Sequence, residues 1–373
     1  MIKKENLYFN FFFVISLVYI IFTNNFFNFE QSIIYGAADG ETYMQIAKAA
    51  PNISSEELVY HKAERFIIPY IIGSIAYIAN VDIFTMFRVF SFISIVLILF
   101  IFLSILNELK VEIFQKYYLF SLLVFNPYII RYYLSLPTLI NDVIFIFSGA
   151  LFIFSILKNK KKYIYLAIII GAACRINTIF FLLAIIATKF FYKKKFIFST
   201  YDIIISLIIF YIISLINSHH ANLVGGYNSA YDLKIRFGLF FSSFSSMELL
   251  NFILFPLINF LPLILIPFFF NFRHNYRDLA NDKLLFISLS IFIMISFTAF
   301  VAGPIITGKN IIRLINLSYP FVIYIIYKLI NNNNVPKKKI QKFIFLSFMI
   351  LWSLHPTYST VKLLNPIFNI LKH

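Results

Sequence analysis

Cysteine, acidic residues and long polar stretches are all scarce in this chain of 373 residues. The one cysteine, Cys174, excludes an intramolecular disulfide and a cysteine-based metal site. No polar stretch exceeds about 40 residues, which is too short to build an independent soluble core. Only 13% of the residues are charged, whereas 61% are hydrophobic. These absences exclude a soluble enzyme and leave a membrane protein as the class.

Apolar runs near the length needed to cross a bilayer recur along the chain, and the mean hydropathy is +0.84. We therefore expect an all-α, polytopic integral membrane protein with about 9–11 membrane helices, some of them short or re-entrant. Residues 1–373 are expected to form a single transmembrane domain. No small-residue cleavage site follows the first run, from Leu7 to Phe22, which favours an uncleaved helix over a signal peptide.

The net charge of +16 does not indicate a nucleic-acid partner, because lysine and arginine gather in short clusters between the apolar runs. Such clusters are typical of cytoplasmic loops and set the orientation of a membrane protein. They lie at residues 3–4, 158–162, 189–195, 273–283 and 337–339. The pattern predicts a multi-pass protein of the bacterial plasma (inner) membrane with its N-terminus in the cytoplasm.

Two cytoplasmic clusters require an even number of crossings between them, yet five apolar segments separate residues 3–4 from 158–162. We expect segment 66–80 not to cross but to stay on the outer side, because such a helix is only about 22 Å long. The alternative is segment 117–136, which Asn126-Pro127 interrupts. Segment 163–188 has lysines at both ends, which predicts a hairpin of two short helices with Arg175 near its tip.

The predicted outer loop, residues 24–65, contains a short amphipathic helix from Gly40 to Ala50. This helix is too short to span a bilayer and can lie flat at the interface. Asp39 precedes it and Glu41 lies in its first turn. An N-cap with a favourable helix dipole would explain both residues, and so would a catalytic carboxylate held at the membrane surface.

A pair of potential cations follows in the same loop. His61 and Arg65 are four residues apart, hence on one helical face, directly before an apolar run that opens with Phe66. Arginine and histidine suit the phosphate of a lipid whose tail would lie against Phe and Ile. Anchoring at the membrane interface is the alternative for both side chains.

The order of these features resembles the GT-C superfamily of integral-membrane glycosyltransferases. The resemblance is carried by four stretches: Asp39-Gly40-Glu41 with His61, Arg65 and Pro69; Arg88 in "FRVFSFISI"; Arg175 in "GAACRINTIFFLLA"; and Arg313 in "NIIRLINLSYPFVI". Two departures from longer members are the lack of paired prolines after Arg65 and of a large soluble C-terminal domain.

The resemblance implies an inverting hexosyltransferase of the cell envelope, acting on the outer face of the membrane. Its donor would be a polyprenyl-phosphate-linked sugar in the lipid bilayer, and its acceptor a glycan, a lipid or a protein. Asp39 would be the general base, and Glu41 would support it or assist a divalent ion. The remaining expected site residues would bind the substrate or its phosphate: His61, Arg65, Asp142, Arg175, Lys309 and Arg313. No cofactor is certain, although Mg or Mn stays open.

Three other functions remain open. An O-antigen-type polymerase or ligase would use Arg236, His219 and His220 of the late loop 217–247. A transporter or flippase should show internal repeats and helices broken at the midplane, and the sequence shows no convincing duplication. A structural or assembly subunit would tolerate the loss of Asp39.

Overall fold

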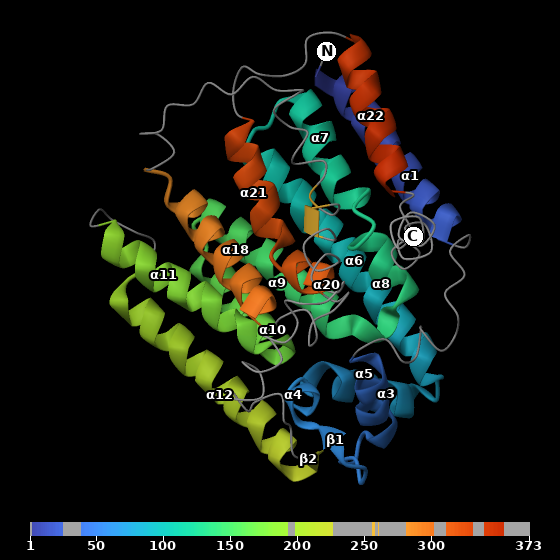
Figure 1. The fold of residues 1–373 in the computed structure, drawn as a ribbon, viewed down its shortest axis with the longest axis vertical. Coiled ribbons are helices and arrows are strands. Elements are labelled where there is room, and N and C mark those ends of the chain that lie inside the picture. Colours follow the sequence, from blue (N-terminus) through green and yellow to red (C-terminus); the bar gives the residue numbers. More distant parts are fainter. Residues whose placement is uncertain are drawn as a thin grey trace, which may run out of the picture.

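The computed structural model describes residues 2–24, 39–192, 198–226, 256–257, 260, 281–301, 311–330 and 339–353. Figure 1 shows its helices, coloured in chain order from blue to red. The elements are α1 (Ile2–Asn24), α3 (Gly40–Ala49), β1 (Leu58–Val59), α4 (Tyr60–Ala63), α5 (Ile67–Ala79), α6 (Ile83–Glu108), α7 (Ile113–Val124), α8 (Ile130–Ser135), η1 (Pro137–Leu139), α9 (Ile140–Leu157), α10 (Lys161–Cys174), η2 (Ile176–Thr178), α11 (Ile179–Phe191), α12 (Thr200–Val224), β2 (Gly225–Gly226), α18 (Lys283–Val301), α20 (Ile311–Asn316), α21 (Tyr319–Leu329) and α22 (Lys339–Ser353).

Within these ranges, four helical stretches are long and apolar enough to cross a membrane, namely α6, η1 with α9, α12 and α18. Five shorter apolar helices accompany them. Large apolar side chains are exposed on the outer surfaces of three of the long helices, α6, α12 and α18, where lipid would cover them. The expected all-α membrane protein is confirmed at this level. The strands described are a parallel pair of two residues each, with Leu58 opposite Gly225.

The lysine-rich helix ends lie together, and we call this region the lysine-rich end, defined by Lys158, Lys161 and Lys189. Lys158 pairs with Glu108 at the end of α6. Lys161 Nζ lies 2.7 Å from the Asp202 carboxylate near the start of α12. The amine of Lys189 bonds the Thr200 hydroxyl of the same turn. That this end faces the cytoplasm stays a prediction.

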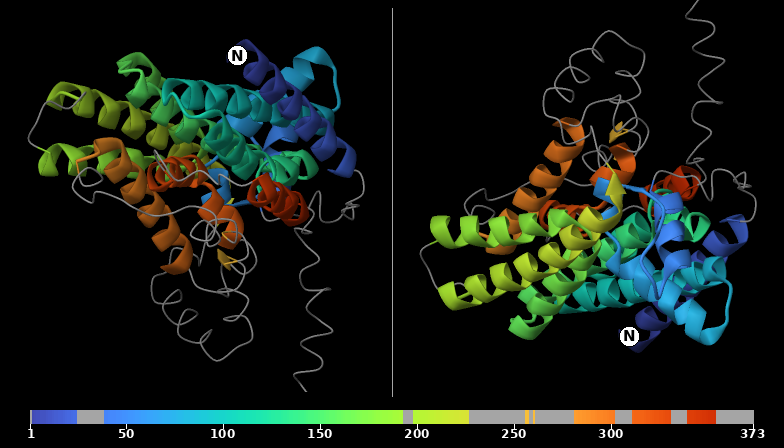
Figure 2. Two further views of the ribbon diagram at one scale, coloured as in Figure 1. Left: turned by 90° about the horizontal axis from the view of Figure 1, so that it is seen from above. Right: turned by 90° about the horizontal axis from the view of Figure 1, so that it is seen from below.

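The predicted hairpin of segment 163–188 agrees with these contacts, since the start of α10 and the end of α11 both lie beside the start of α12. Arg175 occupies the break between the two arms. The two arms share α12 as a neighbour but differ in the other, because α10 packs on α9 whereas α11 packs on α18. Both views of Figure 2 place α18 and α12 on opposite sides of α11.

Segment 117–136 is broken into α7 and α8, as Asn126-Pro127 predicts. A break at membrane depth requires partners for the freed backbone groups. The Asn126 side chain accepts a hydrogen bond from the Tyr128 amide at 2.8 Å. The Tyr319 hydroxyl, from α21, donates to the Leu122 carbonyl at 2.7 Å. Side chains of the protein therefore pair with two of the backbone groups at the break.

The end opposite the lysine-rich end is covered by α3, α4, α5 and the β pair, in the lower part of Figure 1. Helix α5 has 13 residues and ends at Asn80, whose left-handed backbone (φ 49°) turns the chain toward α6. Helix α3 lies against α5 so closely that a Cβ on Gly73 would come 2.1 Å from the Ala47 carbonyl oxygen. This contact fixes α3, and with it the position of Asp39.

Candidate functional site

Five charged side chains from five separate parts of the chain meet beneath the α3–α5 layer. Asp39 precedes α3, Arg65 lies between α4 and α5, Asp142 is in the first turn of α9, Arg175 follows α10, and Arg313 is in α20. We call them the arginine–aspartate cluster. Asp142, Arg175 and Arg313 are buried, while the side chains of Asp39 and Arg65 keep 12% and 18% exposure.

Asp142 is the anchor of the cluster. Its Oδ1 accepts hydrogen bonds from Nε and Nη2 of Arg175, the former at 2.8 Å. Its Oδ2 accepts one from Nε of Arg313. Because both carboxylate oxygens are occupied and the side chain is 0% exposed, Asp142 orients two arginines and is closed to a substrate. Its predicted role as a direct substrate ligand is therefore not supported by its position.

Asp39 is bound differently, through a single oxygen. Its Oδ2 accepts from Arg65 Nη1 at 2.8 Å and from Arg313 Nη2 at 2.5 Å. Arg175 Nη2 lies 3.8 Å from the same oxygen. Among the described residues, Oδ1 of Asp39 has no hydrogen-bond partner. One oxygen thus holds the ion pairs, while the other accepts no hydrogen bond from the described residues.

The electrostatic environment keeps Asp39 ionised. Burial alone would raise the pKa of Asp39, but the charges of Arg313, Arg65 and Arg175 outweigh burial and hold the pKa well below its usual range. The same nitrogen of Arg65 donates to the Tyr43 hydroxyl at 3.2 Å. Burial raises the pKa of Tyr43, so this phenol remains neutral.

Arg175 reaches the cluster because α10 stops one residue before it. Arg175 has an extended backbone (φ −155°, ψ 137°), and the Thr178 hydroxyl donates to its carbonyl at 2.9 Å. Gly171 makes room for this turn, since a Cβ there would lie 2.7 Å from the Thr178 hydroxyl oxygen. The break after α10 therefore places the guanidinium group of Arg175 in the protein interior.

The turn that carries Arg65 is held from two sides. The Asn141 side chain, from α9, donates to the Arg65 carbonyl at 2.9 Å. His220, from α12, bonds the Ala63 carbonyl through Nδ1 at 3.0 Å and stacks on the Phe66 ring. Sequence reasoning missed the structural roles of Asn141 and of Tyr43. The available signal for Asn141 was its position directly beside Asp142.

The cluster carries an excess of positive charge. Three guanidinium groups face two carboxylates, which leaves a net charge of +1 in a largely buried region. An unbalanced buried charge is costly, and arginine forks bind phosphate well. No group of three or more His, Cys, Asp or Glu side chains suited to a metal occurs among the described residues. The excess of guanidinium groups is a chemistry that can bind an anion such as phosphate.

A small cavity of about 50 Å³, the arginine cavity, lies on one side of Arg65. His61 and Glu64 line it with Arg65, together with residues of α10 and α12. Exposed Ile176 also borders it. The predicted grouping of His61 with Arg65 thus agrees with the geometry, because both face the same cavity.

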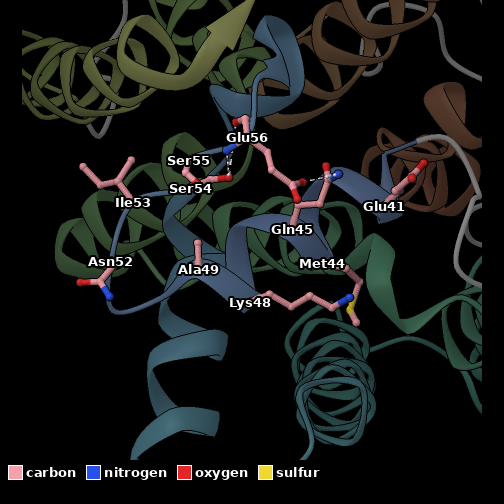
Figure 3. A pocket seen from close by; sticks show the side chains of 10 residues that line it. All are labelled: Glu41, Met44, Gln45, Lys48, Ala49, Asn52, Ile53, Ser54, Ser55 and Glu56. Atoms are coloured by element: carbon pink, nitrogen blue, oxygen red, sulfur yellow. Dashed lines mark hydrogen bonds between the residues drawn. The ribbon is translucent and has the colours of Figure 1, made fainter.

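Glu41 lies outside the arginine–aspartate cluster, where it was expected to support Asp39. Glu41 lines an open groove of about 690 Å³ together with Gln45, Lys48 and Glu56. Figure 3 shows the side chains that line this groove. We call it the α3 groove. The opposite, buried face of α3 carries Tyr43, which contacts Arg65. Residues two apart on a helix do not face each other, so Glu41 is turned away from the cluster that Asp39 joins.

The other expected residues have mixed outcomes. Lys309 and Arg236 lie outside the described residues. His220 is buried in its contacts with α4, whereas His219 is exposed. Asp39, Arg65, Arg175 and Arg313 are brought together as expected, with Asp142 as their anchor.

Comparison with known proteins gave no match to any family model, curated protein or solved structure. The function is therefore inferred from the cluster and its surroundings.

Proposed function

We propose that this chain is a membrane glycosyltransferase of the GT-C type, which moves a sugar from a polyprenyl-phosphate donor to a hydroxyl acceptor. The observation that carries this proposal is the arginine–aspartate cluster. It combines a carboxylate, one oxygen of which has no hydrogen-bond partner among the described residues, with three guanidinium groups that exceed the two carboxylates of the cluster by one charge.

The chemistry needs few protein groups. The acceptor hydroxyl oxygen attacks the anomeric carbon, and the bond from that carbon to the phosphate oxygen breaks. The hydroxyl proton passes to Oδ1 of Asp39, which acts as general base. The charge that develops on the leaving polyprenyl phosphate is offset by Arg65, Arg175 and Arg313.

The surroundings of the arginine cavity suit a lipid-linked donor. The cavity lies between α10 and the membrane-length helix α12. Exposed apolar side chains lie on the elements that line it, namely Ile169 on α10, Ile176 in η2 and Tyr211 on α12. A phosphate in the cavity would meet Arg65 while its isoprenoid tail lay on this apolar surface.

The α3 groove lies on the face of α3 opposite to Tyr43 and the arginines, and Asp39 does not line it. The groove would therefore hold the outer part of an extended acceptor, since Glu41, Glu56 and Lys48 give it a polar lining suited to sugar hydroxyls. The reacting hydroxyl itself must reach Oδ1 of Asp39.

The test is transfer by purified protein in nanodiscs, supplied with a panel of polyprenyl-phosphate-linked monosaccharides and assayed for release of free polyprenyl phosphate. We expect Asp39→Asn to lose at least about 100-fold in rate, the contribution of a positioned general base. Arg65→Gln should raise the donor KM, because it removes a phosphate ligand.

The matched control is Asp82→Asn. Asp82 caps α6 through the Thr85 amide at the same end of the molecule, and Asn caps a helix as well as Asp does. Undiminished transfer by Asp39→Asn would refute the base. A flippase would move the donor across the bilayer without releasing its phosphate, so the same assay separates that function.

A further inference from the structure

We infer that the ion pairs with arginine keep Asp39 from acting as a base until a donor phosphate binds. Arg65 then pairs with the phosphate in place of Asp39, so that Asp39 can accept a proton only when an anionic donor is bound. This inference rests on the proposed function and concerns the regulation of the same site. It assigns to Arg65 the role of the cation that changes partner from Asp39 to the phosphate.

The contacts divide the three arginines into two kinds. Arg175 and Arg313 are each fixed by Asp142, which is itself fully buried. Arg65 pairs with Asp39 and with no other carboxylate of the cluster, and its side chain also lines the arginine cavity. Arg65 therefore separates Asp39 from the place where an anion can enter.

In the resting arrangement Asp39 is a poor proton acceptor. A carboxylate oxygen that already accepts from two guanidinium groups, with a third at 3.8 Å, gains little by binding a proton. A general base works best when its pKa is near the operating pH. Moving Arg65 from Asp39 onto a phosphate would shift the pKa of Asp39 in that direction.

The charge balance favours this exchange. The cluster has a net charge of +1, and a polyprenyl-phosphate-linked sugar is a phosphodiester with a single negative charge. Donor binding therefore brings the total to zero. During transfer Asp39 gains a proton and loses its charge, while the phosphate becomes a monoester and gains one. The net charge therefore stays at zero, and Arg65 changes its partner from the carboxylate to the phosphate.

Among the described residues, four other charged or titratable groups lie around Asp39 and the arginine cavity, namely Tyr43, Asp142, His61 and Glu64. Tyr43 of α3 is neutral, and Asp142 of α9 is committed to its two arginines. His61 and Glu64 of α4 border the arginine cavity. Glu64 opposes an incoming anion, but it is partly exposed and screened by solvent.

This change of partner has two consequences for the reaction. The donor must bind before an acceptor can be activated. Water that enters an empty site is not activated either, because Asp39 is still paired with its arginines. The expected kinetic order is donor first and acceptor second.

The experiment measures the reactivity of Asp39 without any turnover. The protein is placed in nanodiscs that contain either undecaprenyl phosphate or undecaprenol, which has the same chain and no phosphate. Dicyclohexylcarbodiimide, which reacts with protonated carboxyl groups, is added, and labelled peptides are quantified by mass spectrometry. We expect Asp39 to be labelled at least tenfold faster with undecaprenyl phosphate, since a rise of one unit in pKa gives a tenfold rise in the protonated fraction.

Two carboxyl groups in the same digest serve as internal controls. Asp82 is exposed, and Asp202 is paired with Lys161 at the lysine-rich end, so neither should respond to the phosphate. Equal labelling of Asp39 with both lipids would overturn the inference. Labelling needs no transfer, so this result is independent of whether Asp39→Asn retains activity.

Variants of Arg65 give a second line of evidence. Arg65→Gln should make Asp39 reactive with undecaprenol and abolish the response to undecaprenyl phosphate. Arg65→Lys keeps the charge and should keep the response. If Asp39 of the Arg65→Gln protein stays unreactive with undecaprenol and with undecaprenyl phosphate, the inference is wrong.

Discussion

Asp142→Asn is the most direct test of the cluster as a buried ion network. Asp142 accepts three N–H groups from Arg175 and Arg313 and is 0% exposed. Removal of its charge changes the net charge of the cluster from +1 to +2 in the protein interior. Loss of one partner from a buried ion pair costs about 3–5 kcal/mol, because the remaining charge is uncompensated. We expect the upper part of that range, since two arginines are affected.

A double variant separates charge from packing. Asp142→Asn with Arg175→Gln removes one charge of each sign and restores the net charge to +1. The two changes should therefore cost less together than the sum of the single variants, by about 0.5–3 kcal/mol. Asp82→Asn is the control, and its effect should stay within about 0.5 kcal/mol.

The assay is reversible unfolding by SDS in mixed micelles. The chain has one tryptophan, Trp352, which is buried in α22 and gives an intrinsic fluorescence signal. A free energy of unfolding for Asp142→Asn within 1 kcal/mol of the wild type would refute the reasoning. The carboxylate would then not be paired in a buried site.

Two further predictions concern the position of Asp39 and its ionisation. A methyl group on Gly73 would lie 2.1 Å from the Ala47 carbonyl oxygen, so Gly73→Ala should shift α3, cost about 1–3 kcal/mol and slow transfer. Gly149→Ala is the control, because its methyl would meet only side chains, the Phe321 ring at 3.1 Å and Pro320 at 3.6 Å, and equal effects on unfolding would contradict the prediction. The pKa of Asp39 lies below its unfolded value of about 3.9, so its ion pairs contribute their full stability above about pH 4 and lose it as the pH falls further. The difference in unfolding free energy between wild type and Asp39→Asn should be constant from about pH 7 to 5, and a difference that disappears within that range would contradict it.

The breaks in the chain could be predicted from local sequence. Asn126-Pro127 interrupts a helix because proline cannot donate to the helical ladder, and α7 and α8 are separated there. The lysines on both sides of segment 163–188 indicated a hairpin, and the contacts of Lys161 and Lys189 agree with it. The turned-away position of Glu41 was also within reach of sequence reasoning. Its spacing of two residues from Asp39 excludes a common face on the helix.

The different roles of the two aspartates could not be predicted in this way. Asp39 and Asp142 both lie at the start of a helix, and each could have been a simple N-cap. Neither side chain accepts a capping hydrogen bond in the structure. Their exposure differs, 12% against 0%, because α9 is packed inside the helices while α3 covers them.

The sequence by itself determined the class of the protein, since apolar runs of bilayer length and interspersed lysines require a membrane. It also determined where the helices break and which few charges lie outside the lysine clusters. Only the tertiary structure decided that Asp39 and Arg313, 274 residues apart, share an ion pair. The physical reason is that periodicity specifies which face of a helix is buried, whereas packing between helices decides which buried charges meet.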